Sequence, residues 1–214
     1  MEKPTPLYTV GEEIANSITH GIGSALSVVA TVLLIVAAAK SGSAMKVVCA
    51  SIYGTCLIIL FTMSTLYHAL VPPKAKKVFR IFDHISIFIL IAGSYTPIAL
   101  VSVGGWIGWT MFGVVWGIAI LGIVLNSINL EKFKVFSMVA YILMGWCVIV
   151  AIKPVMSALC GSAMKLLVAG GLVYTFGIAF YAMTKIRYMH SIWHVFVLAG
   201  AILQYFCIQL YVIS

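Results

Sequence analysis

The stretch RYMHSIWHVFVLAG, residues 187–200, decides how the rest of the chain is interpreted. It places His190 and His194 four residues apart, where a long apolar run begins. On a helix this spacing puts both imidazoles on one face, one turn apart. Such a pair can share a metal ion, or it can be two polar residues tolerated at a membrane edge. A metal site would need further ligands from elsewhere in the chain.

The composition is that of an integral membrane protein. Hydrophobic residues make up 63% of the 214 residues, charged residues only 8%, and the mean hydropathy is +1.15. Roughly a quarter of the residues in a soluble domain are charged. Because no linker or low-complexity tract interrupts the sequence, we expect a single membrane domain over residues 1–214.

Seven apolar runs have about the 20 residues that a helix needs to cross a bilayer. They cover about residues 17–39, 47–70, 81–101, 106–125, 133–152, 163–184 and 191–213. They predict an all-α bundle of seven transmembrane helices, because a helix satisfies its own backbone hydrogen bonds in lipid. Pro97 is expected to kink the third span or break its hydrogen-bond ladder. Pro154 is expected to end the fifth.

The basic residues predict the orientation. Nine of the 13 lysines and arginines fall on the side that holds the N-terminus, and four on the other. The positive-inside rule therefore places the N-terminus in the cytoplasm and the C-terminus outside, in a multi-pass plasma-membrane protein. The net charge of +8 is explained in this way, and we expect no nucleic-acid partner. The polar first sixteen residues do not resemble a cleavable signal peptide.

The five cysteines are interpreted as small apolar packing residues. Their number is odd, most lie in apolar runs, and none forms a CxxC pair. Disulfides or metal ligands are the alternatives.

The acids and histidines share one end of the predicted bundle, which is the main functional signal of the sequence. Positive-inside orientation accounts for lysines and arginines but not for this gathering. The residues concerned are Glu2, Glu12, Glu13, Asp83, Glu131, His20, His68, His84, His190 and His194.

His68 closes the second span at a depth similar to His190 and His194, which enter the seventh. Three neutral imidazoles leave a tetrahedral Zn²⁺ one open position, as in catalytic zinc sites. Asp83, in the first turn of the third span, is then placed to orient or deprotonate a water. Ser64, one turn deeper than His68, can hydrogen-bond the carboxylate, a ligand or a substrate oxygen. Alternatively, the histidines are ordinary interfacial residues and the serine bonds its own backbone.

His84 follows Asp83 directly and points about 100° away from it on a helix, so we leave it outside the ligand set.

The first span carries a second polar stripe, formed by Glu13, Asn16, Ser17 and His20 at helical spacing. Two interpretations remain open. The stripe can be a helix start with Asn16 or Ser17 as N-cap, or a hydrogen-bonding wall beside the metal site. His20 is not expected to be a fourth ligand, because it would close the catalytic position.

Four segments together resemble the hemolysin III branch of the progestin and adipoQ receptor family. They are EEIANSITHG (12–21), STLYHAL (64–70), FDHISIFILIAGSYTP (82–97) and HSIWHVFVLAG (190–200). The resemblance implies seven helices, a cytoplasmic N-terminus and a zinc ion held by His68, His190 and His194. It also implies that Asp83 lies near the water and that Ser64 is the serine of the S-x-x-x-H motif. We expect no long N-terminal domain, which fits the bacterial branch and its inner-membrane location rather than a peptide-hormone receptor.

Three functions are weighed on this basis. The first is a zinc-dependent intramembrane hydrolase of a lipid amide or ester, with an acyl chain of ceramide-like type as substrate. The wider superfamily of the resemblance includes alkaline ceramidases. The second is a non-enzymatic regulator of membrane homeostasis with structural zinc. The third, a cytolysin, is disfavoured because charged residues do not line a stripe through any span.

Overall fold

The computed structural model describes residues 8–214, so Glu2 and Lys3, which entered the predicted clustering and orientation, lie outside the described residues. Eight α-helices occur in this range, together with a short 3-10 helix and two π-helical turns. The α-helices are α1 Val10–Lys40, α2 Ala44–Ala69, α3 Pro73–Pro97, α4 Gly105–Ile128, α5 Lys134–Gly145, α6 Ile152–Ala158, α7 Gly161–Ala182 and α8 Met189–Ile208. The others are η1 Ile98–Val103, η2 Cys147–Ile149 and η3 Gln209–Ile213.

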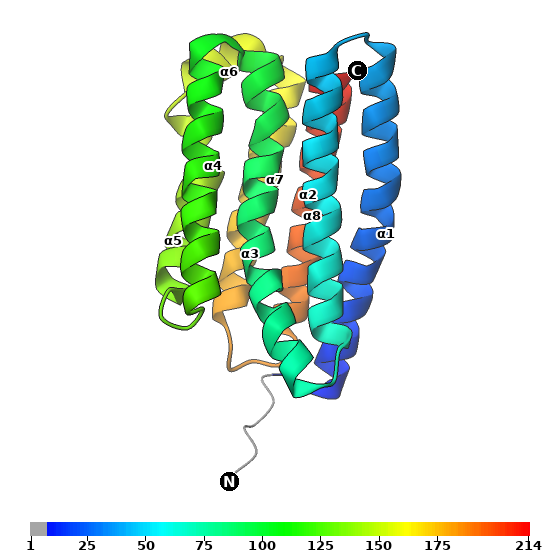
Figure 1. Cartoon of the computed structure of the whole chain (residues 1–214), viewed down its shortest axis with the longest axis vertical. Coiled ribbons are helices and arrows are strands. Elements are labelled where there is room, and N and C mark those ends of the chain that lie inside the picture. Colours follow the sequence, from blue (N-terminus) through cyan, green and yellow to red (C-terminus); the bar gives the residue numbers. More distant parts are fainter. Residues whose placement is uncertain (1–7) are drawn as a thin grey trace.

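The predicted all-α membrane bundle is confirmed. Six helices are long and apolar enough to cross a membrane, and the count rises to seven if the pair 134–149 and 152–158, bent by 58°, is one span. The long helices run side by side along one axis (Figure 1). Their outer faces carry exposed apolar side chains such as Val29 and Val32. Lipid is the solvent that suits such a surface.

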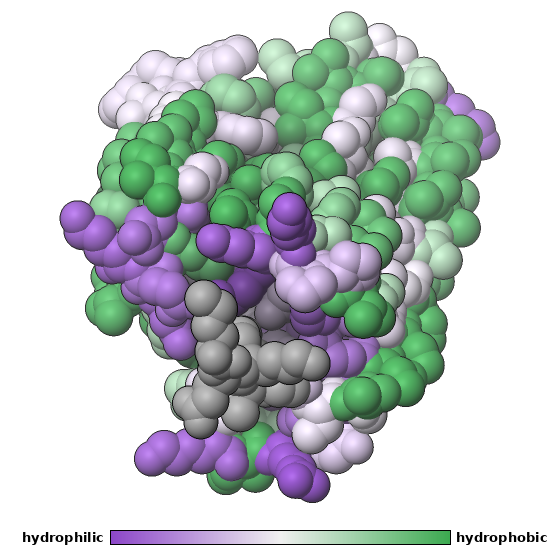
Figure 2. All heavy atoms as spheres, turned by 60° about the horizontal axis from the view of Figure 1, so that its bottom comes forward, coloured by the Kyte–Doolittle hydropathy of each residue, from purple (hydrophilic) through white to green (hydrophobic). Residues whose placement is uncertain are grey.

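The bundle has two different ends. α1 begins at the bottom of Figure 1, and the C-terminus lies at the top. We call the bottom the histidine end, because His68 and His190 lie there in the last turn of α2 and the first turn of α8. Polar side chains gather on it in Figure 2, whereas apolar residues cover the sides. The polar groups are thus concentrated at one end of the apolar bundle.

At the histidine end the helices extend beyond the predicted apolar runs. α1 begins at Val10 rather than about residue 17, because Thr9 and Glu12 form a capping box. The interpretation of Asn16 or Ser17 as N-cap is therefore wrong. α3 begins at Pro73 rather than about residue 81, with the proline in the first turn, where its missing N–H is tolerated.

The two prolines have different outcomes. At Pro97 the α-helical ladder gives way to the π-helical turn η1, as predicted for the third span. Pro154 does not end the fifth span, contrary to our expectation. It lies in the first turn of α6, and the span is instead interrupted between Gly145 and Ile152.

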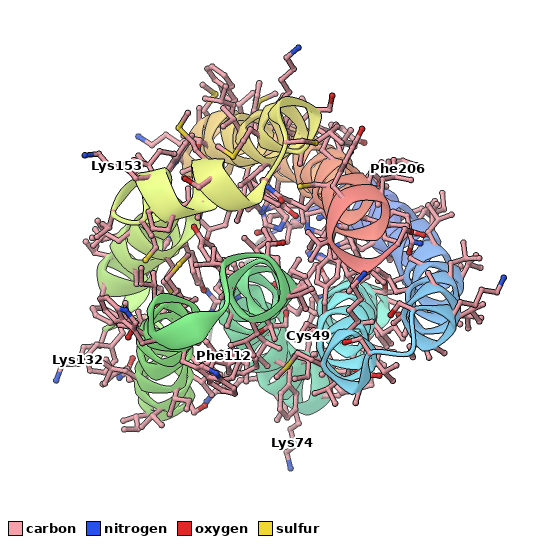
Figure 3. All side chains as sticks on the ribbon, turned by 90° about the horizontal axis from the view of Figure 1, so that it is seen from above. Cys49, Lys74, Phe112, Lys132, Lys153 and Phe206 are labelled. Atoms are coloured by element: carbon pink, nitrogen blue, oxygen red, sulfur yellow. The ribbon has the colours of Figure 1, made fainter. Side chains whose placement is uncertain are left out.

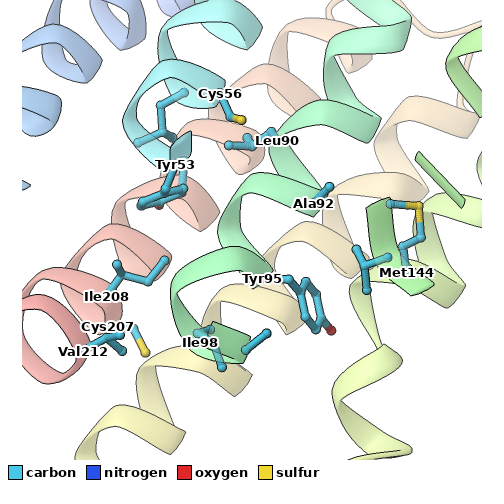
Figure 4. Packing of buried hydrophobic residues seen from close by; sticks show 14 of the residues in the cluster. Tyr53, Cys56, Leu90, Ala92, Tyr95, Ile98, Met144, Cys207, Ile208 and Val212 are labelled. Carbon is cyan, nitrogen blue, oxygen red and sulfur yellow. The ribbon is translucent and has the colours of Figure 1, made fainter. Parts of the chain in front are cut away.

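α3 lies near the centre of the bundle, as the view along the axis shows (Figure 3). It is the most buried of the candidate spans, with 61% of its apolar window inside. Close packing relies on glycine: a Cβ on Gly93 would meet Cys56 Sγ at 2.5 Å, so this glycine allows α2 and α3 to approach closely. The five cysteines are free, and Cys56 and Cys207 are among those in the buried core (Figure 4).

Candidate metal centre

Three histidines come together at the histidine end. His68 arrives from the end of α2, and His190 and His194 from the first two turns of α8. Their candidate ligand nitrogens all lie within 4.8 Å of one another. The Nε2 atoms of His190 and His194 are 3.1 Å apart. The geometry therefore groups the three histidines that the spacing singled out.

The tautomer of His68 is fixed by a carboxylate. Its Nδ1 lies 2.6 Å from Oε2 of Glu13, so Nδ1 carries the proton and donates it to the carboxylate. The lone pair is thereby left on Nε2, a buried atom with no hydrogen-bond partner within residues 8–214. Glu13 also pairs with Lys76 at 2.8 Å. Metal-bound histidines usually have such a second partner on the other ring nitrogen.

These residues suit a metal ion. The Nε2 atoms of His190 and His194 are in close contact. The Nε2 of His68, which has no hydrogen-bond partner within residues 8–214, lies beside them in a buried region. A buried unpaired polar atom such as His68 Nε2 is costly unless something binds it. Three imidazoles are ligands that Zn²⁺ and related transition metals accept. The cluster can hold a metal ion, and the carboxylates of Glu13 and Asp83 nearby supply compensating negative charge.

Asp83 and Ser64 line a small cavity of about 30 Å³ together with His190 and His194. Ser64 Oγ is buried and makes no hydrogen bond to any residue that the structure describes. It does not bond its own backbone, so that alternative interpretation of the serine is wrong. The cavity thus brings both predicted catalytic side chains next to the histidine cluster.

His84 is turned away from the ligand set. Its Nδ1 donates to the backbone carbonyl of Arg80 at 2.9 Å and lies 3.5 Å from Asp83 Oδ2. It lines the small cavity but does not belong to the group of three ligands.

The polar stripe of α1 forms a wall beside the cluster, which is the second of the two interpretations left open. Asn16 accepts a hydrogen bond from Ser191 on α8 at 2.6 Å, and its Nδ2 lies 3.3 Å from His68 Nδ1. Glu13 holds the same nitrogen of His68. Ser17 takes no part, because its hydroxyl donates to the carbonyl of Ile14.

His20 belongs to this wall and not to the ligand group. Its ring stacks on His194 with centroids 3.7 Å apart, and its Nε2 lies 3.3 Å from the backbone oxygen of His194. Its Nδ1 is buried without a partner among residues 8–214. His20 therefore packs face to face with His194 and holds its ring in place.

Two residues of the site were given no specific role from the sequence, although Glu12 was counted among the acids at this end. Glu12 accepts a hydrogen bond from the backbone N–H of Tyr188 at 2.8 Å, joining the start of α1 to the start of α8. The pattern Thr9-x-x-Glu12 is a readable capping-box signal, although it does not reveal this second contact. Tyr8 stacks on His190 at 4.7 Å, and burial raises the pKa of its hydroxyl, which stays protonated at neutral pH. Nothing in the sequence pattern indicates Tyr8.

A second, larger cavity of about 180 Å³ lies deeper in the bundle, between α3, α5, α7 and α8. Its wall is almost wholly apolar. Leu90 and Tyr95 of α3 and Ile98 of η1 belong to it, and Tyr95 points towards α5 in Figure 4. Five residues line both cavities: Leu60, Ile87, Tyr181, Trp193 and Val197. The histidine site therefore shares a wall with a space of lipid-like character.

The fold and site define a multi-pass α-helical membrane protein with a histidine cluster, able to hold a metal ion, at one end of the bundle. The model of the Haemolysin-III related family matches residues 8–205, and the chain belongs to that family. The four motifs and the comparison thus agree on the family.

Individual relatives span nearly the whole chain. Hemolysin-3 of Bacillus cereus is 45% identical over 204 residues, which cover 95% of this chain and 93% of that protein. The Hemolysin-3 homolog of Bacillus subtilis (strain 168) is 42% identical over 208 residues, covering 97% and 98%. The human Monocyte to macrophage differentiation factor is 28% identical over 209 residues, covering 95% and 85%.

Proposed function

We propose that this chain is a zinc-dependent hydrolase that cleaves an amide or ester bond of a membrane lipid inside the bilayer. The observation that carries the proposal is the wall shared by the histidine site and the apolar cavity. A lipid with its acyl chain in the cavity would bring its carbonyl beside Asp83 and the three histidines. A ceramide-like amide is the proposed substrate class, with its N-acyl chain in the apolar cavity.

Zinc is the proposed metal, and His68, His190 and His194 would hold it. When bound, it would polarise a carbonyl and make a water more acidic. Three neutral nitrogens leave one coordination position for this purpose, as in known catalytic zinc sites.

The protein's own groups have distinct roles in the proposal. Asp83 accepts the proton of the attacking water and returns it to the leaving amine or alcohol. Ser64 Oγ, which is buried without a partner within residues 8–214, donates a hydrogen bond to a substrate oxygen. Glu13 keeps the Nδ1 proton on His68, so that its Nε2 faces the centre. The apolar cavity holds the chain and excludes bulk water.

The proposed location is the bacterial inner membrane, with the histidine end in the cytoplasm. The bacterial relatives and the distribution of lysine and arginine support it. A substrate would then enter from the inner leaflet.

A regulator of membrane state with structural zinc is the second candidate. The specific support is that the ligands come from both α2 and α8, with Glu13 of α1 behind them, so one ion would tie three helices together. Lipid hydrolysis by the purified protein distinguishes the hydrolase from the regulator.

The test is metal content and hydrolysis measured on the same samples. Purified wild type should contain one zinc per chain and release fatty acid from ceramide or a fluorescent acyl amide. His194→Ala and chelated wild type should lose both metal and turnover. Equal zinc in wild type and His194→Ala would overturn the site, and stoichiometric zinc without turnover of any acyl amide or ester would favour the regulator.

A further inference from the structure

Gln204 places a polar group in the wall of the apolar cavity. Its Nε2 donates to the backbone carbonyl of Leu167 on α7 at 3.0 Å. Its Oε1 is buried and has no hydrogen-bond partner within residues 8–214. The residue as a whole is only 8% exposed. One strong acceptor is therefore left uncommitted beside the space that we assign to a lipid chain.

The orientation of this amide is held by its surroundings. A Cβ on Gly170 would lie 2.7 Å from Gln204 Nε2, so a glycine at that position makes room for the amide against α7. The Nε2 side is fixed by Leu167, which leaves the oxygen free. A buried amide oxygen without a donor is destabilising, because it has lost its hydrogen bonds to water. A leucine would fill the same wall without that cost, so the glutamine calls for an explanation.

Within residues 8–214 no polar group of the wall donates to this oxygen, and several of these groups are engaged elsewhere. The hydroxyl of Tyr95 donates to Gly145 O at 2.9 Å and accepts from Val148 N at 3.0 Å. The indole N–H of Trp146 donates to Thr175. The geometry thus leaves a ligand in the cavity as the source of the hydrogen-bond donor that Gln204 Oε1 lacks.

The distance from the histidine site limits what the donor can be. Trp193 lines both cavities and Gln204 lines the larger one, eleven residues further along α8. At about 1.5 Å per residue this is roughly 16 Å along the helix axis. A donor on the head of a lipid whose carbonyl lies at the histidines would be too far away.

We propose that Gln204 binds a hydroxyl group carried on the lipid chain itself, well away from the bond that is cleaved. The substrate or ligand class is then an acyl lipid with a hydroxylated chain, rather than a plain saturated one. This inference rests on the proposed function only in assuming that the chain lies in the cavity with its carbonyl at the histidine end. It makes no use of hydrolysis.

Binding can therefore be measured apart from turnover. The probes are stearoyl amide and a series of hydroxystearoyl amides in which the hydroxyl is moved from the carbonyl end to the methyl end. Affinity would be read from the tryptophan fluorescence of the detergent-solubilised protein, since Trp146 and Trp193 line the cavity. The matching isomer should bind about 2- to 12-fold more tightly than the plain amide, which corresponds to about 0.5–1.5 kcal/mol for one hydrogen bond.

Gln204→Leu should abolish this preference and bind the plain amide at least as well as wild type. Gln209→Leu is the matched control and should keep the preference, because Gln209 lies outside the cavity lining. If wild type binds all isomers and the plain amide equally, the inference is wrong, whatever the variants do. That result would leave the proposed hydrolase standing. A clear hydroxyl preference without any hydrolysis would support Gln204 and count against the hydrolase.

Discussion

Glu13 Oε2 and His68 Nδ1 lie 2.6 Å apart, so a carboxylate on α1 sets the tautomer of a histidine on α2. Lys76 at the start of α3 pairs with the same carboxylate and also donates to the carbonyls of Tyr67 and Leu70 at the end of α2. Glu13 and Lys76 thus link α1, α2 and α3 next to His68, one of the three candidate ligands.

Removal of this carboxylate should weaken metal binding without removing a ligand. We expect Glu13→Ala to reduce zinc affinity about 10- to 100-fold, the usual effect of losing an outer-shell partner of a metal-bound histidine. Competition with a chromophoric chelator would measure it. Glu131→Ala is the control, because Glu131 pairs with Arg80 and is 65% exposed. Equal affinities in the two variants would contradict the role given to Glu13.

Asp83→Asn should separate metal binding from chemistry. The amide cannot accept a proton as the carboxylate does, so we expect turnover to fall by about 10²–10⁴, the usual contribution of a general base. Zinc content should remain at one per chain, because Asp83 is outside the ligand group. An active Asp83→Asn would contradict the proposed role, and parallel loss of zinc would make Asp83 a ligand.

Chelation should lower the thermal stability of the wild type. A metal that binds only the folded state at about 1,000 times its dissociation constant adds about 4 kcal/mol. For a chain of this length its removal should lower Tm by on the order of 10 °C. His194→Ala should melt at the same temperature with and without chelator. A chelator effect of equal size in that variant would place the stabilising metal elsewhere.

Val197→Phe should narrow the junction between the two cavities, since Val197 lines both. We expect turnover of long-chain amides to fall at least tenfold, whereas zinc content stays unchanged. Val195→Phe, two residues away and 54% exposed on the outer surface, should behave as wild type. Steady-state kinetics on substrates of two chain lengths would show the effect, and an unimpaired Val197→Phe would argue against a chain that passes this point.

Thr9→Ala should loosen the histidine end by removing the N-cap of α1. The expected loss is about 0.5–2 kcal/mol of stability. Because Glu12 also holds the backbone of Tyr188, hydrogen exchange should accelerate at the start of α8 as well as at the start of α1. Exchange that changes only in α1 would show that the two starts are not coupled.

Much of the fold could be predicted from the sequence, because lipid imposes a simple rule on apolar length. The apolar runs located the long helices. They missed the first turns of α1 and α3, which lie beyond the apolar stretch and depend on a capping box and on Pro73. They also missed the interruption of the fifth span, since residues 145–152 remain mostly apolar where the ladder fails.

The site was predictable where helical spacing alone decides which residues share a face. His190 and His194 are one turn apart on a single helix, and similar membrane depth brought His68 level with them. Depth does not reveal the rotation of a helix about its axis. The sequence therefore left open whether Asn16 faced the cluster, and gave no sign that Tyr8 would stack on His190.

The division of the histidines between α2 and α8 has a consequence for biosynthesis. Helices enter the membrane in the order in which they are translated, so His68 is in place long before its two companions are made. A nascent chain that stops before α8 holds only one of the three candidate ligands, His68, with the Glu13 carboxylate beside it, too few groups to retain a metal ion at this site. Metal capture would thus report that the last helix has been inserted and packed, and a ribosome-stalled series of truncated chains would show at which length it begins.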